Sequence, residues 1–327
     1  MMLRLIILGS FMNVFLGISG AIACNVPVFR YALERWQSDE YQLVILHQKD
    51  LNGEQKQMIE SIEASTREKG GSLNLSVSSH DLREHLDSPF VTIWTDHATD
   101  EKSPIAVLLY SENAREVPDR IVSIKPLSEI NIQNLIDSPA RNLLVKKILS
   151  GDSAVWLFVE SGNSKQDQEA YQRLRDQIEW NKNHLQLPQQ ELLEADEFYN
   201  QENPIELKLD FSIVKVNRHD PRESHLIDIL MGSEIDLEEL DQPMAFPVIG
   251  RGRVLYALVG KGIYKETIEM ASKFVVGPCS CQVKEQNPGF DLLLNADWSS
   301  SIKGQPLSRP SSNENQKPVL IEIPTGK

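Results

Sequence analysis

The stretch SAVWLFVESGNSKQDQEAYQRLRDQIEWNKNH (153–184) joins a near-continuous apolar run to a long polar segment. The apolar run, residues 153–161, is short and rich in β-branched and aromatic residues, which is typical of a buried strand. The segment after it predicts a long helix from about Asp167 to His184. Because a buried strand that leads into a helix is the repeating unit of α/β proteins, this stretch sets the expected fold class.

Units of this kind occur in both halves of the chain. After residue 184 the sequence predicts a strand (205–218) and a short helix (223–232). Two strands joined by the turn Gly250-Arg251-Gly252 follow (245–262), and then a helix (263–277). Before residue 153 it predicts a short helix (28–36), a strand (41–47), a helix (54–69) and three strands (73–77, 90–94 and 104–110). A helical region (128–149) follows, which Ser128 caps and which is interrupted near Pro139. Residues 185–204 are expected to be an insertion.

This order of elements resembles the thioredoxin fold, and Pro247 resembles the cis-proline position of that fold because it leads into a hairpin strand. The resemblance implies an α/β protein with two tandem thioredoxin-like domains, residues 24–150 and 151–298. Each domain would be a three-layer α/β/α arrangement around a mixed sheet. Residues 299–327, rich in Ser, Pro and Asn, are expected to form a disordered tail.

The chemistry of thioredoxins is missing from the expected places. Those proteins carry Cys-x-x-Cys between the first buried strand and the next helix, where the helix N-terminus stabilises a thiolate. The corresponding stretches here are HQKDLNGEQKQ (47–57) and ESGNSKQDQEAY (160–171), and neither contains a cysteine. Thiol–disulfide exchange at the usual position is therefore excluded.

Two longer motifs carry a second resemblance. The segments VPVFRYALERW (26–36) and GPCSCQVKEQNPG (277–289) are similar to those of a family of uncharacterised exported bacterial proteins. The resemblance implies export and tandem thioredoxin-like domains that lack Cys-x-x-Cys, and it implies no particular activity.

The N-terminus has the features of an export signal. Residues 1–23 begin with the cationic Arg4, continue as an apolar run, and end in small residues at positions 21 and 23. Because the next residue is Cys24, three outcomes stay open: acylation of Cys24 in a bacterial lipoprotein, plain cleavage of the signal peptide, or an uncleaved membrane anchor. All three place the body of the protein in the periplasm or the wider cell envelope, with membrane contact only through the N-terminus.

The net charge excludes some partners. The formal charge is −14, whereas binding to nucleic acid requires a surplus of Lys and Arg on some face. The same balance argues against docking on an anionic membrane surface. We therefore expect no nucleic-acid partner, and an envelope protein is the expected kind of partner. No cofactor is expected either, because the sequence carries neither a P-loop nor a dinucleotide-binding fingerprint.

Residues 277–289 hold two of the three cysteines, Cys279 and Cys281, one residue apart. A disulfide between them would close a small, strained and therefore reducible ring, and Lys284 would favour a thiolate, so one hypothesis is a thiol–disulfide exchange site. A second is a soft-metal clip for copper or zinc, although no Cys or His within the next dozen residues completes it. The structural alternative, a bridge from Cys24 to Cys279 or Cys281 or an unreactive buried pair, is favoured on spacing.

Other polar and aromatic groups have plain structural interpretations. The histidine pairs His80/His85 and His219/His225 lack the i, i+4 spacing of helical metal ligands. Arg251 and Arg253 would bind an anion only if they project together, and a solvated hairpin tip is favoured. The acidic turn 235–242 lacks the spacing of a Ca²⁺ loop. The aromatic residues Phe29, Tyr31 and Trp36 are expected to anchor the first helix to the core.

The function expected from the sequence is that of a non-catalytic binding or assembly scaffold in the envelope. The alternative is a thiol–disulfide or copper-handling protein that uses Cys279 and Cys281 in place of the missing motif. A hydrolase is disfavoured because the sequence shows no nucleophile elbow and no metal constellation.

Overall fold

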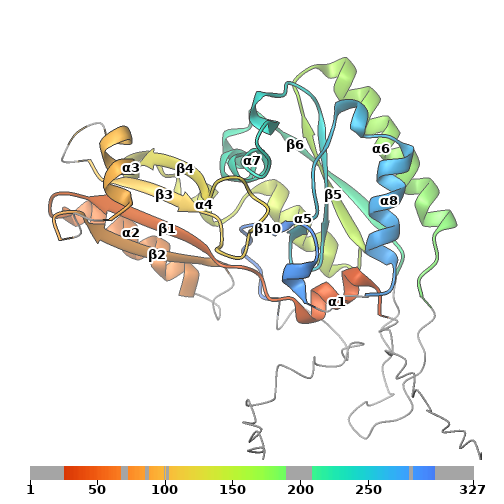
Figure 1. Ribbon diagram of the computed structural model, residues 1–327, viewed down its shortest axis with the longest axis horizontal. Coiled ribbons are helices and arrows are strands. Elements are labelled where there is room, and N and C mark those ends of the chain that lie inside the picture. The colour runs from red at the N-terminus through yellow and green to blue at the C-terminus, as the bar shows by residue number, and fades with distance from the viewer. Residues whose placement is uncertain are drawn as a thin grey trace, which may run out of the picture.

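The computed structural model describes residues 26–67, 73–84, 88–98, 100, 103–188, 208–279 and 283–298. These residues form a mixed α/β structure with two mixed sheets, which occupy the two sides of Figure 1. The expected α/β class is therefore confirmed. None of the helices in these ranges is long and apolar enough to cross a membrane.

The first sheet has four strands in the order β2-β1-β3-β4. Strand β1 pairs parallel with β2 and antiparallel with β3, and β4 pairs antiparallel with β3. The strands are β1 (Tyr41–His47), β2 (Leu75–Asp81), β3 (Ile105–Leu109) and β4 (Ile121–Pro126). Helix α2 (Gly53–Arg67) covers one face through Ile59 and Ile62, and α3 (Phe90–His97) covers the other through Trp94.

The second sheet repeats this strand order and extends it, as β10-β8-β7-β5-β6. Strands β5 and β6 are parallel, and β7 and β8 are antiparallel to their neighbours. The strands are β5 (Ala154–Glu160), β6 (Phe211–Asn217), β7 (Met244–Ile249), β8 (Arg253–Val254), β10 (Phe290–Asp291) and a short β9 (Leu258–Val259) beside β7. Helices α6 (Ser164–His184) and α8 (Lys265–Val276) lie on one face, and α5 (Pro139–Leu149) and α7 (Ser224–Met231) lie on the other.

The first half departs from the sequence prediction in three places. Residues 90–94, predicted as a strand, begin helix α3, because Phe90, Val91 and Trp94 recur at helical spacing and face the same apolar cluster. The strand that pairs with β3 is instead β4, which the sequence analysis missed and whose residues are all half-buried. Ser128 lies in a 3₁₀ turn and caps no long helix; Asn131 caps α4 (Ile132–Ile136) and Ser138 caps α5.

The N-terminal helix α1 (Val28–Arg35) belongs to the first half by sequence but packs on the second sheet. Phe29, Tyr31 and Trp36 are buried there with residues of β5, β7 and α8, which confirms their anchoring role. The hairpin turn at Gly250 lies directly against α1: its φ is 56°, and an added Cβ would come within 2.6 Å of the Ala32 Cβ. Only glycine fits this turn while α1 stays in place.

The C-terminal segment, residues 283–298, belongs to the second half by sequence but contacts the first half. Leu73 and Asn295 form an isolated β-bridge beside the first sheet. The Asn74 side chain accepts a hydrogen bond from the Leu294 backbone N–H at 2.7 Å and donates to the Leu292 carbonyl at 3.0 Å. Each half of the chain therefore carries a terminal segment that packs into the other half.

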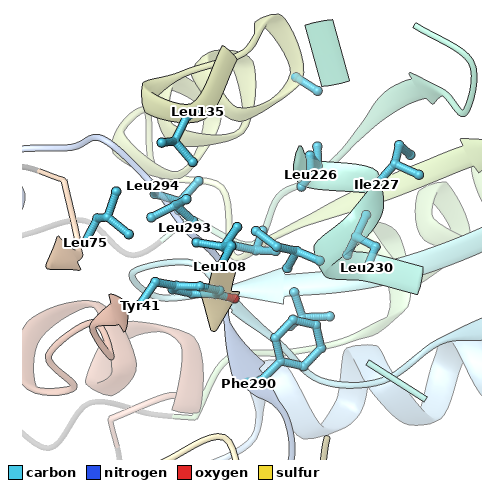
Figure 2. Close-up of a cluster of buried hydrophobic side chains, with 14 of the residues drawn as sticks. Tyr41, Leu75, Leu108, Leu135, Leu226, Ile227, Leu230, Phe290, Leu293 and Leu294 are labelled. Carbon is cyan, nitrogen blue, oxygen red and sulfur yellow. The ribbon is translucent and has the colours of Figure 1, made fainter. Parts of the chain in front are cut away.

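One apolar core accordingly spans both sheets (Figure 2). Tyr41, Leu75 and Leu108 come from the first sheet, Leu226 and Leu230 from α7 of the second half, and these groups meet around Phe290, Leu293 and Leu294. Because residues from all parts of the chain exclude water from the same volume, the two halves stabilise each other.

Candidate functional site

A cluster of four charged side chains is buried where the two chain ends meet. Lys284 Nζ lies 2.6 Å from Asp291 Oδ2 and 2.9 Å from Asp39 Oδ1. Arg253 Nη1 lies 3.3 Å from Asp291 Oδ1. We call Asp39, Arg253, Lys284 and Asp291 the ion cluster; its two cations and two anions balance, which limits the cost of removing them from water.

Hydrogen bonds to the backbone complete the ion cluster. Arg253 donates to the carbonyls of Asn287 at 2.7 Å and Pro288 at 3.0 Å. Asp291 accepts from the Asp39 backbone N–H at 2.8 Å. Burial raises the pKa of Asp291, and the charges of Lys284 and Arg253 oppose that rise. With its polar atoms engaged in this way, the cluster is suited to holding the chain rather than to chemistry.

The structure corrects the roles expected for Lys284, Arg253 and Arg251. Lys284 is buried and its ammonium is bound to two carboxylates, so it does not serve as a nearby charge for a cysteine thiolate. Arg253 is not at a solvated hairpin tip but inside the cluster. Arg251 is half-buried and donates to the Leu33 carbonyl at 2.8 Å and the Glu34 carbonyl at 3.1 Å, which fixes α1 to the hairpin.

Cys279 is buried in the apolar core of the second half, with 2% of its surface exposed. Its backbone N–H donates to the Val26 carbonyl at 2.9 Å, next to a β-bridge between Pro27 and Pro278. An exchange reaction requires a sulfur atom that a partner thiol can reach. The burial of Cys279 therefore favours the structural interpretation over the redox one.

Cys24 and Cys281, the other candidates from the sequence, lie outside the described residues. Acylation of Cys24, a bridge from Cys24 to Cys279 or Cys281, and a pair between Cys279 and Cys281 therefore stay predictions from the sequence.

The loop between β5 and α6 occupies the position where an exchange motif was sought in the second half. The Asp167 carboxylate accepts from the Ser161 backbone N–H and hydroxyl, both at 2.8 Å, and from the Gly162 N–H at 3.1 Å. Asn163 caps α6 by accepting from the Gln166 N–H at 3.2 Å. The helix start is thus capped by an amide side chain, and the loop where a thiolate would lie is held by an internal carboxylate.

A shallow depression of about 520 Å³ opens beside this loop. Its walls come from the end of β5, the first turns of α6 and the edge strand β6, and they comprise Glu160, Gly162, Ser164, Asp167, Gln168, Tyr171, Gln172, Arg175, Lys215 and Asn217. Lys215 lies 4.1 Å above the centre of the Tyr171 ring and 3.4 Å from Glu160. In α/β sheets, ligands bind at the carboxyl ends of parallel strands, and this depression lies at that end of β5 and β6.

Pro247 does not occupy the position expected for it. It lies inside β7, paired with Trp156, and its peptide bond is trans like the others in the described ranges. The proline at the start of this strand is Pro243, which directly precedes Met244. The sequence analysis missed Pro243, although a proline directly before a strand was the available signal.

A second buried polar group lies where α7 meets the first half. Arg141 is 1% exposed and donates to the carbonyls of Leu135 and Leu293, both at 3.1 Å. Burial lowers the pKa of Arg141 to about 10. His225, on α7, is buried with its Nδ1 atom unpartnered. Burial, helped by the charges of Lys125 and Arg141, lowers the pKa of His225 to about 4.

Among the described residues, no group of three or more His, Cys, Asp or Glu side chains is placed to hold a metal ion. The acidic turn 235–242 has exposed carboxylates around the buried Leu237, in line with a solvated turn. No family model, no curated protein and no solved structure matches the chain.

Replacing Lys284 by Met should destabilise the protein strongly, because Asp39 and Asp291 would be left buried without their ammonium partner. We expect the free energy of unfolding in urea to fall by about 3–5 kcal/mol. Lys273→Met is the control, since Lys273 is exposed and pairs with Glu269 on the surface of α8; it should cost about 0.3–0.5 kcal/mol. Equal costs for the two variants would contradict a supporting role for the ion cluster.

His225 should make stability depend on pH. The unfolded chain binds a proton near pH 6.5, whereas folded His225 has its pKa lowered to about 4. Stability is therefore lost as pH falls from 6.5 to 4, by about 3 kcal/mol in all. His225→Gln should abolish this part of the pH dependence in urea titrations. An unchanged slope between those pH values would contradict the buried, neutral histidine.

Cys279 should resist alkylation in the folded, reduced protein. Because its side chain is buried, we expect iodoacetamide to modify it only as fast as the surrounding core opens. Ser164→Cys, at the exposed first residue of α6, supplies a matched exposed thiol that should react at once. Peptide mass spectrometry reads both sites; equally rapid modification of Cys279 would contradict its burial and favour the redox hypothesis over the structural one.

Proposed function

We propose that the protein is an exported envelope protein that serves as a binding or assembly scaffold. In this proposal its halves are tandem thioredoxin-like units that have lost the thiol chemistry of that fold. The support for the fold is the repeated strand order, β2-β1-β3-β4 and β6-β5-β7-β8. In both, the first two strands are parallel and the others antiparallel, as in thioredoxins.

The observation that carries the proposal is the state of the loop before α6. An exchange enzyme needs the N–H groups at this helix start to stabilise a thiolate. Here the Gln166 N–H at the start of α6 donates to the Asn163 side chain instead, and the buried Asp167 carboxylate accepts from the Ser161 and Gly162 N–H groups of the loop before it. In the first half the corresponding α2 start is closed by reciprocal bonds between Asn52 and Gln55, each at 2.9 Å. Both helix starts are therefore capped by their own side chains.

The thiol alternative loses support from the cysteine region itself. Cys279 is buried, and the charge of Lys284 is bound to Asp39 and Asp291. The prediction of export depends on residues 1–23 and the prediction of acylation depends on Cys24. All of these residues lie outside the described ranges. A scaffold anchored at Cys24 would need neither a cofactor nor a reactive sulfur.

The depression beside α6 is the partner site in this proposal. It lies at the carboxyl ends of β5 and β6, and its walls carry amide, carboxylate, ammonium and guanidinium groups rather than a closed apolar lining. Polar, open sites of this kind suit a protein surface better than a small apolar ligand, which needs most of its area buried.

A photo-crosslinking amino acid at Gln172, inside the depression, tests the scaffold function in bacterial cells that export the protein. We expect one discrete adduct, with an envelope protein identified by peptide mass. The same amino acid at Gln57, exposed on α2 in the first half, is the control and should give no such adduct. Absence of an adduct at Gln172, or the same adduct at both positions, would contradict the proposed partner site.

A further inference from the structure

His47 and Ser79 form a hydrogen-bonded pair at the edge of the first sheet. His47 is the last residue of β1, and Ser79 lies on the parallel neighbour β2. Side chains alternate along a strand, so both project to the face that α2 covers, on the same side as Leu43 and Leu75. His47 Nε2 lies 3.1 Å from Ser79 Oγ.

The other ring nitrogen of His47 settles which way this bond runs. His47 Nδ1 lies 2.9 Å from the Lys49 carbonyl oxygen. A carbonyl oxygen only accepts, so in the neutral imidazole Nδ1 carries the proton and Nε2 is left as an acceptor for the Ser79 hydroxyl. The Ser79 hydroxyl, the His47 imidazole and the Lys49 carbonyl are therefore arranged as nucleophile, base and orienting group are in enzymes with an activated serine.

The surroundings of the pair are polar and open. Ser79 is exposed and His47 half-buried, so a substrate can reach the hydroxyl. Asp81 faces His47 in the strand register. Arg83 lies 2.6 Å from Asp50 and also binds Asp81, which keeps a half-exposed guanidinium at this edge.

We propose that Ser79 is a nucleophile activated by His47, and that the pair hydrolyses small polar carboxylic esters. Ser79 Oγ attacks the ester carbonyl carbon while His47 Nε2 takes the hydroxyl proton. The bond from that carbon to the alcohol oxygen then breaks, and the alcohol leaves with the proton from His47. A water molecule attacks the acyl-serine in the same way, which releases the carboxylic acid and returns the proton to Ser79.

This activity goes beyond the scaffold function and does not depend on it. The partner site proposed above lies on β5, α6 and β6, whereas the His47–Ser79 pair belongs to the first sheet. The residues are 32 positions apart in the chain and carry no nucleophile-elbow motif. The sequence argument against a hydrolase was the absence of a nucleophile elbow and of a metal constellation, and it therefore does not exclude a serine activated by a histidine from a distant part of the chain.

The test uses the purified full chain with a fluorophosphonate probe, followed by release of p-nitrophenol from p-nitrophenyl acetate. The probe phosphonylates an activated serine: the P–O bond forms, the P–F bond breaks, and fluoride leaves. We expect labelling at Ser79, none in Ser79→Ala, and a rate at least about 100-fold lower in His47→Ala. Added imidazole should restore part of the His47→Ala rate, which a purely structural role would not allow.

Ser78→Ala is the matched control, because Ser78 is an exposed serine on the same strand that points to the opposite face. It should label and hydrolyse like the unaltered protein. Labelling of the unaltered protein should also vanish in urea, which separates a built site from a reactive side chain. Labelling at other residues only, or equal labelling in the folded, urea-treated and Ser79→Ala proteins, would overturn the inference, and neither result bears on the crosslinking experiment at Gln172.

Discussion

The contact between Lys284 and Asp291 is the interaction on which the rest of the architecture depends. A buried ammonium and a buried carboxylate tolerate few arrangements, because each loses several kcal/mol of hydration unless its partner is in place, on the order estimated for ions in protein interiors. Asp39 and Arg253 complete the charge balance. The cluster therefore selects one way of bringing the segment before β1, the β7–β8 hairpin and the C-terminal segment together.

This selection explains why the two sheets form one unit. The segment that carries Lys284 and Asp291 continues through Leu293 and Leu294 into the core between the sheets. The segment that carries Asp39 is preceded by α1, which packs in the second half. Gly289 lies between Lys284 and Asp291 with a φ of 101°, and a Cβ there would overlap the Val254 carbonyl oxygen, so only glycine fits this turn. Such a rigid, reciprocally joined body is suited to presenting a partner surface of fixed shape.

Local features were predictable from the sequence, and long-range pairings were not. Strand β1 was predicted to the residue and β5 nearly so, because a run of apolar side chains bounded by polar ones is a local signal. Residues 90–94 fit a strand or a helix equally well by composition, and tertiary packing decided for a helix. The roles of Arg253, Lys284 and Ser79 depend on distant partners; Asp39 and Asp291, for example, lie 252 residues apart, so no local pattern indicates them.

Native-state hydrogen exchange tests most directly whether the ion cluster makes the halves one cooperative unit. The amide protons to compare are those of the central strands, Leu43–Ile45 in β1 and Val155–Leu157 in β5, all of which are buried. The account predicts the same opening free energy for both strands, and an equal fall in both when Lys284 is replaced by Met. If β1 opened several kcal/mol more easily than β5, with β5 unaffected by the substitution, the halves would be independent domains and the account would be wrong.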